Sequence, residues 1–251
     1  MIHFVGAGSG AVDLITVRGA RYLEEADIII YAGSLVNPDL LSYAKEDCEI
    51  YNSAKMTLEE VMEVIHRGLK ENKQIVRLHT GDSSIYGAVR EQFDLLDREC
   101  IEYDVTPGVS SFCGAAASLK AEFTLPEQSQ TVIISRMEGR TPVPERESLD
   151  KLASHRSTMV LFLSAGMTDK VREKLLEGGY AEDTPAAIVY KATWPDEKKV
   201  YCTVGTLHQA AEENGIRNLA LLIIGDCLGE NIARSRLYAP DFSTGFREAT
   251  E

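Results

Sequence analysis

Residues 186–204 read Ala186-Ala-Ile-Val-Tyr190, then Lys191-Ala-Thr-Trp194-Pro-Asp-Glu-Lys-Lys199, then Val200-Tyr-Cys-Thr-Val204. Two apolar runs flank a turn-rich segment, and this pattern predicts an antiparallel hairpin. Elsewhere the chain alternates strand and helix patterns, and 251 residues of repeated β/α units are also typical of a TIM barrel. Parallel strands need crossovers, whereas a hairpin pairs neighbouring strands antiparallel. The hairpin therefore favours two α/β domains with mixed parallel and antiparallel sheets.

The small-residue stretch Gly114-Ala-Ala-Ala-Ser118 interrupts the regular alternation of strand and helix patterns along the chain. We expect the domain boundary there, with an N-terminal α/β domain at residues 1–113 and a C-terminal α/β domain at 114–251. Thr16 is a predicted N-cap, and Thr57 with Glu60 has the spacing of a capping box. The predicted strands are 2–5, 28–31, 74–79, 101–105, 131–134, 159–163 and 220–224, and the predicted helices are 17–26, 58–71, 88–96, 114–118 and 169–176.

Composition narrows the class of protein. A hydrophobic fraction of 44% and a charged fraction of 26% are ordinary for a globular chain. The net charge of −13 repels phosphate backbones, so we expect no nucleic-acid partner. Five cysteines without a Cys-x-x-Cys pair, and no His pair at i, i+4, predict reduced thiols, a cytoplasmic location and no metal site. The apolar runs are too short for a bilayer, and no signal peptide is evident.

Three glycine-containing loops each follow a predicted strand: Gly6-Ala-Gly-Ser-Gly-Ala11, His79-Thr-Gly-Asp-Ser-Ser-Ile-Tyr-Gly87 and Thr106-Pro-Gly-Val-Ser-Ser111. Since ligands of open α/β sheets bind beyond strand carboxyl ends, the three loops predict one shared cleft. The first loop fits the relaxed dinucleotide pattern, but the second strand ends in Tyr31-Ala-Gly33 without the acidic residue that an NAD site needs. A tight turn without a ligand is the alternative for the first loop, and capping of the next helix is the alternative for Asp82. The P-loop and nucleophile-elbow motifs are both absent.

Together the loops resemble those of the tetrapyrrole methylases, which are S-adenosylmethionine-dependent methyltransferases without a Rossmann domain. Residues 5–16 are similar to that family's opening G-x-G-P-G-x-x-x-L-L-T, with Ser9 where proline is usual. Residues 77–87 are similar to its G-D-P-x-x-Y/F-G loop, with Ser83 in place of proline, and residues 106–111 to its P-G-V/I-S/T-S/A turn. Proline fixes the backbone dihedral φ, so the serines at these two positions leave the geometry of both loops less constrained than in the family.

Further segments resemble the precorrin-4 C11-methyltransferases of cobalamin synthesis: Tyr31-Ala-Gly-Ser-Leu-Val36, Tyr51-Asn-Ser-Ala-Lys55 and residues 135–145. The Asp-Arg that uroporphyrinogen methylases tend to carry after the tyrosine of the first segment is absent. The resemblance implies a homodimer of two α/β domains, with the cofactor in an interdomain trough and a corrin-ring precursor as substrate. Other precorrin or uroporphyrinogen methylases, a nicotinamide-dependent oxidoreductase and a catalytically silent binding module remain alternatives.

The resemblance also implies site residues. The positions that match contacts to S-adenosylmethionine are Ser9, Thr80, Gly81, Asp82, Ile85, Ser110, Ser111, Leu163 and Ala192. Leu163 matches a position that packs on adenine and Ala192 a backbone contact to the same base. An apolar residue that ends a strand is more commonly core, which is the alternative for both.

A substrate rich in carboxylates needs local positive charge in so acidic a protein. Arg136 and Arg140 are the predicted substrate-binding residues, because guanidinium groups bind carboxylates bidentately. Arg146 belongs to the same candidate loop, whereas Arg90, Lys55 and Lys191 are weaker candidates. Solvated surface arginines are the alternative. Asp82, Tyr86 and His79 are possible proton acceptors, but no general base is assigned, since transfer from a sulfonium depends mainly on positioning.

Overall fold

The computed structural model describes residues 1–230 and 235–250, and the chain forms two compact units. The first comprises Met1–Ala115 and Lys191–Glu197, and the second comprises Ala116–Tyr190 and Lys198–Glu251. The predicted boundary after residue 113 lies two residues before this division. The segment 191–197, placed by sequence in the C-terminal domain, packs with the first unit instead.

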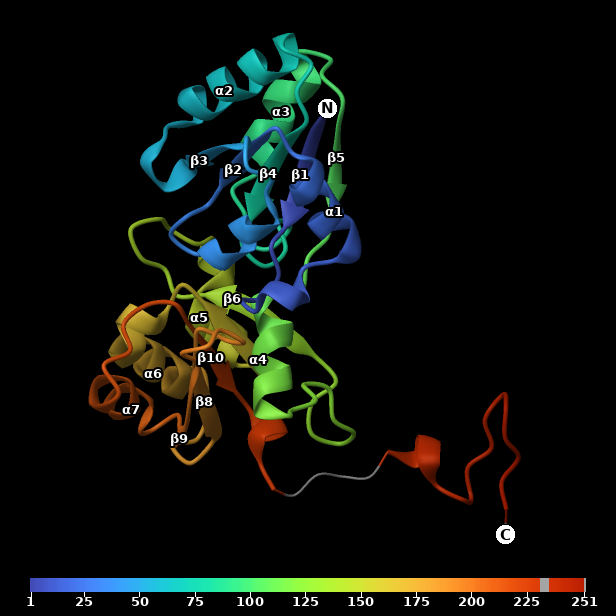
Figure 1. Cartoon of the computed structure of the whole chain (residues 1–251). Helices are drawn as coiled ribbons and strands as arrows, with labels where there is room; N and C mark the ends of the chain where they lie inside the picture. Colours follow the sequence, from blue (N-terminus) through green and yellow to red (C-terminus); the bar gives the residue numbers. More distant parts are fainter. Residues whose placement is uncertain (231–234, 251) are drawn as a thin grey trace. The chain divides into compact units, whose positions relative to one another are not determined.

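The first unit is built on a five-stranded sheet in the order β3-β2-β4-β1-β5, and every pair in it is parallel (Figure 1). One face carries a core under α1 and the short helix Pro38–Tyr43, and the other face a core under α2 and α3. The elements are β1 Ile2–Gly6, α1 Val17–Glu25, β2 Ile28–Tyr31, β3 Glu49–Asn52, α2 Leu58–Lys70, β4 Ile75–His79, α3 Arg90–Arg98 and β5 Tyr103–Thr106. The next helix, α4 Ser111–Leu119, begins in this unit and ends in the second.

Local sequence explains several of these boundaries. Thr16 accepts a hydrogen bond from Gly19 N at the start of α1, and Thr57 and Glu60 form the predicted capping box of α2. The helix predicted from residue 88 begins two residues later, because Ala88 has a left-handed backbone (φ 47°) that no α-helix accommodates. Strand β3 was not predicted, since Glu49–Asn52 is a polar edge strand with no fully buried residue.

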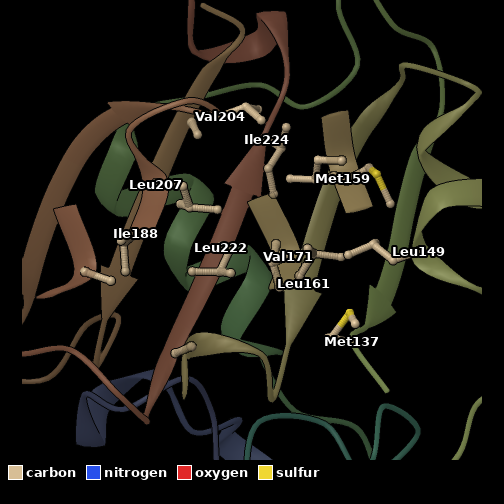
Figure 2. Close-up of a cluster of buried hydrophobic side chains, with 14 of the residues drawn as sticks. Met137, Leu149, Met159, Leu161, Val171, Ile188, Val204, Leu207, Leu222 and Ile224 are labelled. Atoms are coloured by element: carbon tan, nitrogen blue, oxygen red, sulfur yellow. The ribbon is translucent and has the colours of Figure 1, made fainter. Parts of the chain in front are cut away.

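The second unit holds a sheet in the order β6-β7-β10-β8-β9, in which only β6 and β7 run parallel. The β8–β9 pair is the predicted hairpin, so the fold class of two α/β units with a mixed sheet is confirmed, the mixing being confined to this sheet. Helices α5, α6 and α7 bury side chains against it, and Figure 2 shows Val171 of α6 in the same core as Met159 of β7 and Leu222 of β10. The elements are β6 Val132–Arg136, α5 Leu149–Ala153, β7 Thr158–Phe162, α6 Thr168–Glu177, β8 Pro185–Tyr190, β9 Lys198–Thr203, α7 Leu207–Glu213 and β10 Ala220–Ile224.

Candidate functional site

The three glycine loops of the first unit meet at one edge of its sheet. Strand β1 lies between β4 and β5, with Gly6 opposite His79 and Val5 opposite Thr106, so all three strands end together. Beyond these ends the first two loops continue to pair. Gly8 N donates to Gly81 O at 3.2 Å, and Gly81 N donates to Gly8 O at 3.1 Å. The predicted convergence of the loops within this unit is therefore confirmed.

The third loop touches the other two at backbone distance. A Cβ atom on Gly108 would lie 2.1 Å from Gly81 O, and one on Gly6 would lie 2.6 Å from the Gly108 Cα. Real Cβ atoms do not approach backbone atoms this closely. Glycine is thus required at positions 6 and 108 because the backbones of the three loops approach closely, and not by a bound molecule alone.

Asp82 ties the second loop to the third. Its Oδ2 accepts a hydrogen bond from Gly108 N at 2.8 Å, and its Oδ1 accepts from Ser84 N at 2.9 Å and from the Ser84 hydroxyl. Burial disfavours the ionised carboxylate, but these hydrogen bonds outweigh that effect and lower the pKa of Asp82. The alternative that Asp82 caps the next helix is wrong, because α3 begins at Arg90 without a side-chain cap.

The predicted serines and glycines of the site gather around this junction. A Cβ on Gly81 would stand 3.4 Å from Ser111 N and 3.5 Å from the Ser110 Cα, which places the second loop against the start of α4. Ser9 and Ser110 are buried. A Cβ on Gly114 would lie 2.6 Å from the Ser9 Cβ, so α4 packs against the first loop as well.

Two buried hydroxyl groups near the strand ends lack a hydrogen-bond partner among the described residues. They are Thr80 Oγ1, at a predicted site position, and Thr106 Oγ1 at the end of β5. Buried polar atoms in native proteins are nearly always bonded to protein, water or ligand. Ile85, also predicted, is half-buried, and its N–H donates to Asp82 O at 3.3 Å. This edge of the sheet is thus a place where a polar ligand is expected.

His79 is buried at the end of β4 and is a poor proton acceptor. Burial, helped by the charge of Arg77, lowers the pKa of His79 to about 3, so the imidazole is neutral at physiological pH. Arg77 itself is buried and donates to Gln92 Oε1 and to Ile30 O, both at 3.1 Å. The Arg77 side chain is thus accounted for by these interior bonds, whereas His79 Nε2 is buried without a hydrogen-bond partner among the described residues.

Ala192, a predicted site residue, lies against the first glycine loop although it is far along the sequence. It is buried, and its carbonyl oxygen would lie 2.8 Å from a Cβ on Gly10. The residue that follows it, Thr193, was not predicted as a site residue, yet its Oγ1 lies 3.0 Å from both Ser9 Oγ and Ala11 N. In the sequence, Trp194 and Pro195 indicated a hairpin turn here, but they gave no signal that the turn contacts the first loop.

The remaining predicted residues belong to the second unit. Leu163 follows β7 with φ of 53° and is 61% exposed, so the alternative that it is core is wrong. Arg136 uses its guanidinium within its own loop, donating to Thr141 O at 3.2 Å and to Pro142 O at 2.8 Å. Arg140 is exposed, and among the described residues no hydrogen bond or ion pair engages it. Of the two arginines, Arg140 has its charge available.

The weaker cationic candidates differ in the same way. Lys191 lies 2.6 Å from Asp196 and 5.0 Å from the Trp194 ring, and Arg90 pairs with Asp94 at 2.7 Å. Lys55 is exposed. Arg146, predicted in the same candidate loop as Arg136 and Arg140, pairs with Glu147 at 3.3 Å. Across residues 1–230 and 235–250, no group of three His, Cys, Asp or Glu side chains is arranged to hold a metal ion. Within the same residues, no helix has the length and apolar character needed to cross a bilayer.

Comparisons with known proteins agree with this geometry. Over 99% of its length the chain is 52% identical to a cobalt-precorrin-4 C(11)-methyltransferase of Methanocaldococcus jannaschii, covering 96% of that protein. The crystal structure of a cobalt precorrin-4 methyltransferase, described as a cobalamin biosynthetic enzyme, matches with a TM-score of 0.89 and 47% identity, over 91% of this chain and 96% of that one.

A uroporphyrin-III C-methyltransferase from Thermus thermophilus, complexed with S-adenyl homocysteine, matches with a TM-score of 0.76 and 25% identity, over 91% of this chain and 93% of that one. The model of the family described as Tetrapyrrole (Corrin/Porphyrin) Methylases matches residues 1–208. The resemblance carried by the three glycine loops is thereby confirmed: this chain belongs to the tetrapyrrole (corrin/porphyrin) methylase family.

Proposed function

We propose that this chain is an S-adenosylmethionine-dependent C-methyltransferase that methylates C11 of cobalt-precorrin-4 in cobalamin biosynthesis. The observation that carries the proposal is the backbone contact of Gly6, Gly81 and Gly108 at the carboxyl edge of a parallel sheet. The substrate is supported by relatives, since the proteins at 52% and 47% identity are named for cobalt-precorrin-4, whereas a uroporphyrin-III methyltransferase reaches 25%.

The methyl donor is held, in this proposal, by the loops at the ends of β1, β4 and β5. The buried hydroxyl of Thr80, which has no partner among the described residues, suits a polar ligand such as a nucleoside with an amino-acid tail. The exposed Leu163 suits an apolar contact to a flat base. The full proposed set is Ser9, Thr80, Gly81, Asp82, Ile85, Ser110, Ser111, Leu163 and Ala192.

The chemistry needs little beyond geometry. S-adenosylmethionine, when bound, supplies a methyl group on a positively charged sulfur, already activated for displacement. The protein must hold the donor so that the ring carbon attacks the methyl group in line with the sulfur. The hydrogen-bonded loops provide this fixed geometry. The Asp82 hydrogen bonds to Ser84 and Gly108 hold two of the loops together, so Asp82 acts here by positioning backbone. His79, buried and neutral, keeps its structural role.

Substrate carboxylates require cations, and Arg140 is the better of the two predicted arginines because its guanidinium is free to bind. Arg136 supports the same loop through its bonds to Thr141 and Pro142. Replacing Arg140 with alanine then weakens macrocycle binding and leaves donor affinity intact, whereas loss of both affinities, or of neither, contradicts this role.

The proposal also includes a homodimer working in the cytoplasm. The five cysteines are all free thiols, which suits a reducing compartment. Sedimentation of the purified protein tests the dimer.

Incubation with methyl-labelled S-adenosylmethionine and either cobalt-precorrin-4, metal-free precorrin-4 or uroporphyrinogen III tests the activity. Label on C11 of the cobalt substrate supports the proposal. Label only on uroporphyrinogen, or on another carbon, overturns the substrate assignment, and absence of any transfer overturns the activity.

A further inference from the structure

The turn of the β8–β9 hairpin, residues 191–197, bonds directly to the first glycine loop. Thr193 Oγ1 accepts a hydrogen bond from Ala11 N at 3.0 Å and shares a second bond of 3.0 Å with Ser9 Oγ. One hydroxyl thus holds two residues of a loop that is 184 positions away in the chain. Both partners lie inside the first compact unit, to which this turn belongs.

Gly10, between these two residues, is held from two further directions. Asn37 Nδ2 donates to Gly10 O at 2.9 Å, and the Asn37 Oδ1 is itself fixed by Asp39 N at 3.0 Å. The Trp194 ring lies so close that a Cβ on Gly10 would stand 2.1 Å from its Cδ1. We call Asn37, Thr193 and Trp194 the loop clamp, because together they fix Ser9, Gly10 and Ala11.

Thr193 adopts a backbone conformation that its side chain disfavours. Its φ of 67° is left-handed, where a β-branched residue is strained and glycine or asparagine is not. The surroundings enforce this conformation, since Thr193 N donates to Glu197 Oε2 at 2.6 Å and Lys191 pairs with Asp196 at 2.6 Å. A strained residue in this place is explained by what its hydroxyl does, which is to hold the first glycine loop.

We propose that Thr193 is a positioning residue for S-adenosylmethionine, which sets donor affinity by holding Ser9–Ala11 in the binding conformation together with Asn37 and Trp194. The inference rests on the proposed function, because it takes the first loop to be part of the donor site. Without the hydroxyl, Ala11 N loses its acceptor and the loop populates other conformations. The apparent affinity then falls in proportion to the fraction of molecules that keep the competent one.

Titration calorimetry with S-adenosylhomocysteine on the full-length protein tests the inference. Thr193→Val removes the hydroxyl at nearly constant volume, and we expect Kd to rise about tenfold, the effect of one lost hydrogen bond of ~1.4 kcal/mol. Thr193→Ser keeps the hydroxyl and restores Kd to within about twofold of the wild type. Thr203→Val, a matched loss of hydroxyl in β9 of the same hairpin, leaves Kd unchanged.

Thr193→Gly distinguishes the effect of losing the hydroxyl from the effect of backbone strain at this position. Glycine accepts φ of 67° without strain, so this variant keeps its thermal unfolding transition but binds S-adenosylhomocysteine as weakly as Thr193→Val. The fluorescence of Trp194, the only tryptophan, gives a second readout at the clamp itself. We expect ligand to change that fluorescence at about tenfold lower concentration in the wild type than in Thr193→Val.

The outcomes are distinguishable. A wild type that does not bind S-adenosylhomocysteine refutes the proposed function. A wild type that binds, with Thr193→Val and Thr193→Gly binding equally well, refutes the role of Thr193 and leaves the proposed function standing. Weak binding by Thr193→Ser also overturns it, because a side-chain shape would then matter rather than the hydroxyl.

Discussion

Replacing Gly108 with alanine tests whether the three glycine loops act as one structural unit. The added Cβ would stand 2.1 Å from Gly81 O and 2.8 Å from the Gly6 Cα. A carbon and a carbonyl oxygen normally stay about 3.3 Å apart, so the second and third loops must separate by roughly 1.2 Å. The bond that joins these two loops, from Gly108 N to Asp82 Oδ2 at 2.8 Å, does not survive a shift of that size.

The expected cost follows from these contacts. Overpacking costs about 1–3 kcal/mol, and the lost hydrogen bond to a charged carboxylate about 2 kcal/mol, so Gly108→Ala loses about 3–5 kcal/mol of unfolding free energy. A displacement near 1 Å in a positioning site lowers kcat/KM about 100-fold.

Urea unfolding measures the stability loss and steady-state methyl transfer measures kcat/KM, in the wild type, Gly108→Ala and Gly245→Ala. Titration with S-adenosylhomocysteine adds the ligand affinity of each. Gly245 is the control because a Cβ there meets no atom within 4 Å. If Gly108→Ala unfolds at the wild-type urea concentration and binds the ligand as tightly as the wild type, the three loops do not contact one another at Gly108.

Two further predictions concern charged and titratable groups. Asp82→Asn keeps one acceptor oxygen, which cannot serve both Ser84 and Gly108. We therefore expect the free energy of unfolding, measured with urea at pH 7, to fall by about 1–2 kcal/mol. An unchanged urea midpoint contradicts the bridging role of Asp82. His79 has a folded pKa of about 3 against 6.5 for an unperturbed histidine, so its contribution is complete above pH 6.5 and is lost as the pH falls toward 3. Between pH 7 and pH 5 the wild type should lose ~2 kcal/mol more than His79→Gln, and parallel pH dependences of the two proteins refute this.

Much of the fold could be predicted because its signals are local. The capping box of Thr57 and Glu60 sets the start of α2, and buried runs such as Ala220–Ile224 set strands. Elements whose signals are weak were missed: β3 lies at a sheet edge with polar residues, and α5 spans only Leu149–Ala153. The start of α3 was placed too early because left-handed Ala88 is not glycine and gave no warning.

The candidate site divides in the same way. The glycine motifs predicted Ser9, Gly81 and Asp82 as site positions from sequence alone, and the structure brings their loops together. Thr193 escaped notice because nothing near it in sequence indicates a bond to a loop 184 residues earlier. Arg136 and Arg140 looked equivalent as sequence, and only their contacts separate an arginine that braces its loop from one that is exposed.

By itself, the sequence determined the α/β class, the three loops after three strands and the family, because turns, caps and apolar periodicity act over a few neighbouring residues. Tertiary structure decided that β1 lies between β4 and β5, which brings Gly6, Gly81 and Gly108 into contact, and that the hairpin turn carrying Thr193 packs on the first loop. Strand order and long-range packing depend on the free energy of the whole folded unit, and no short segment encodes them.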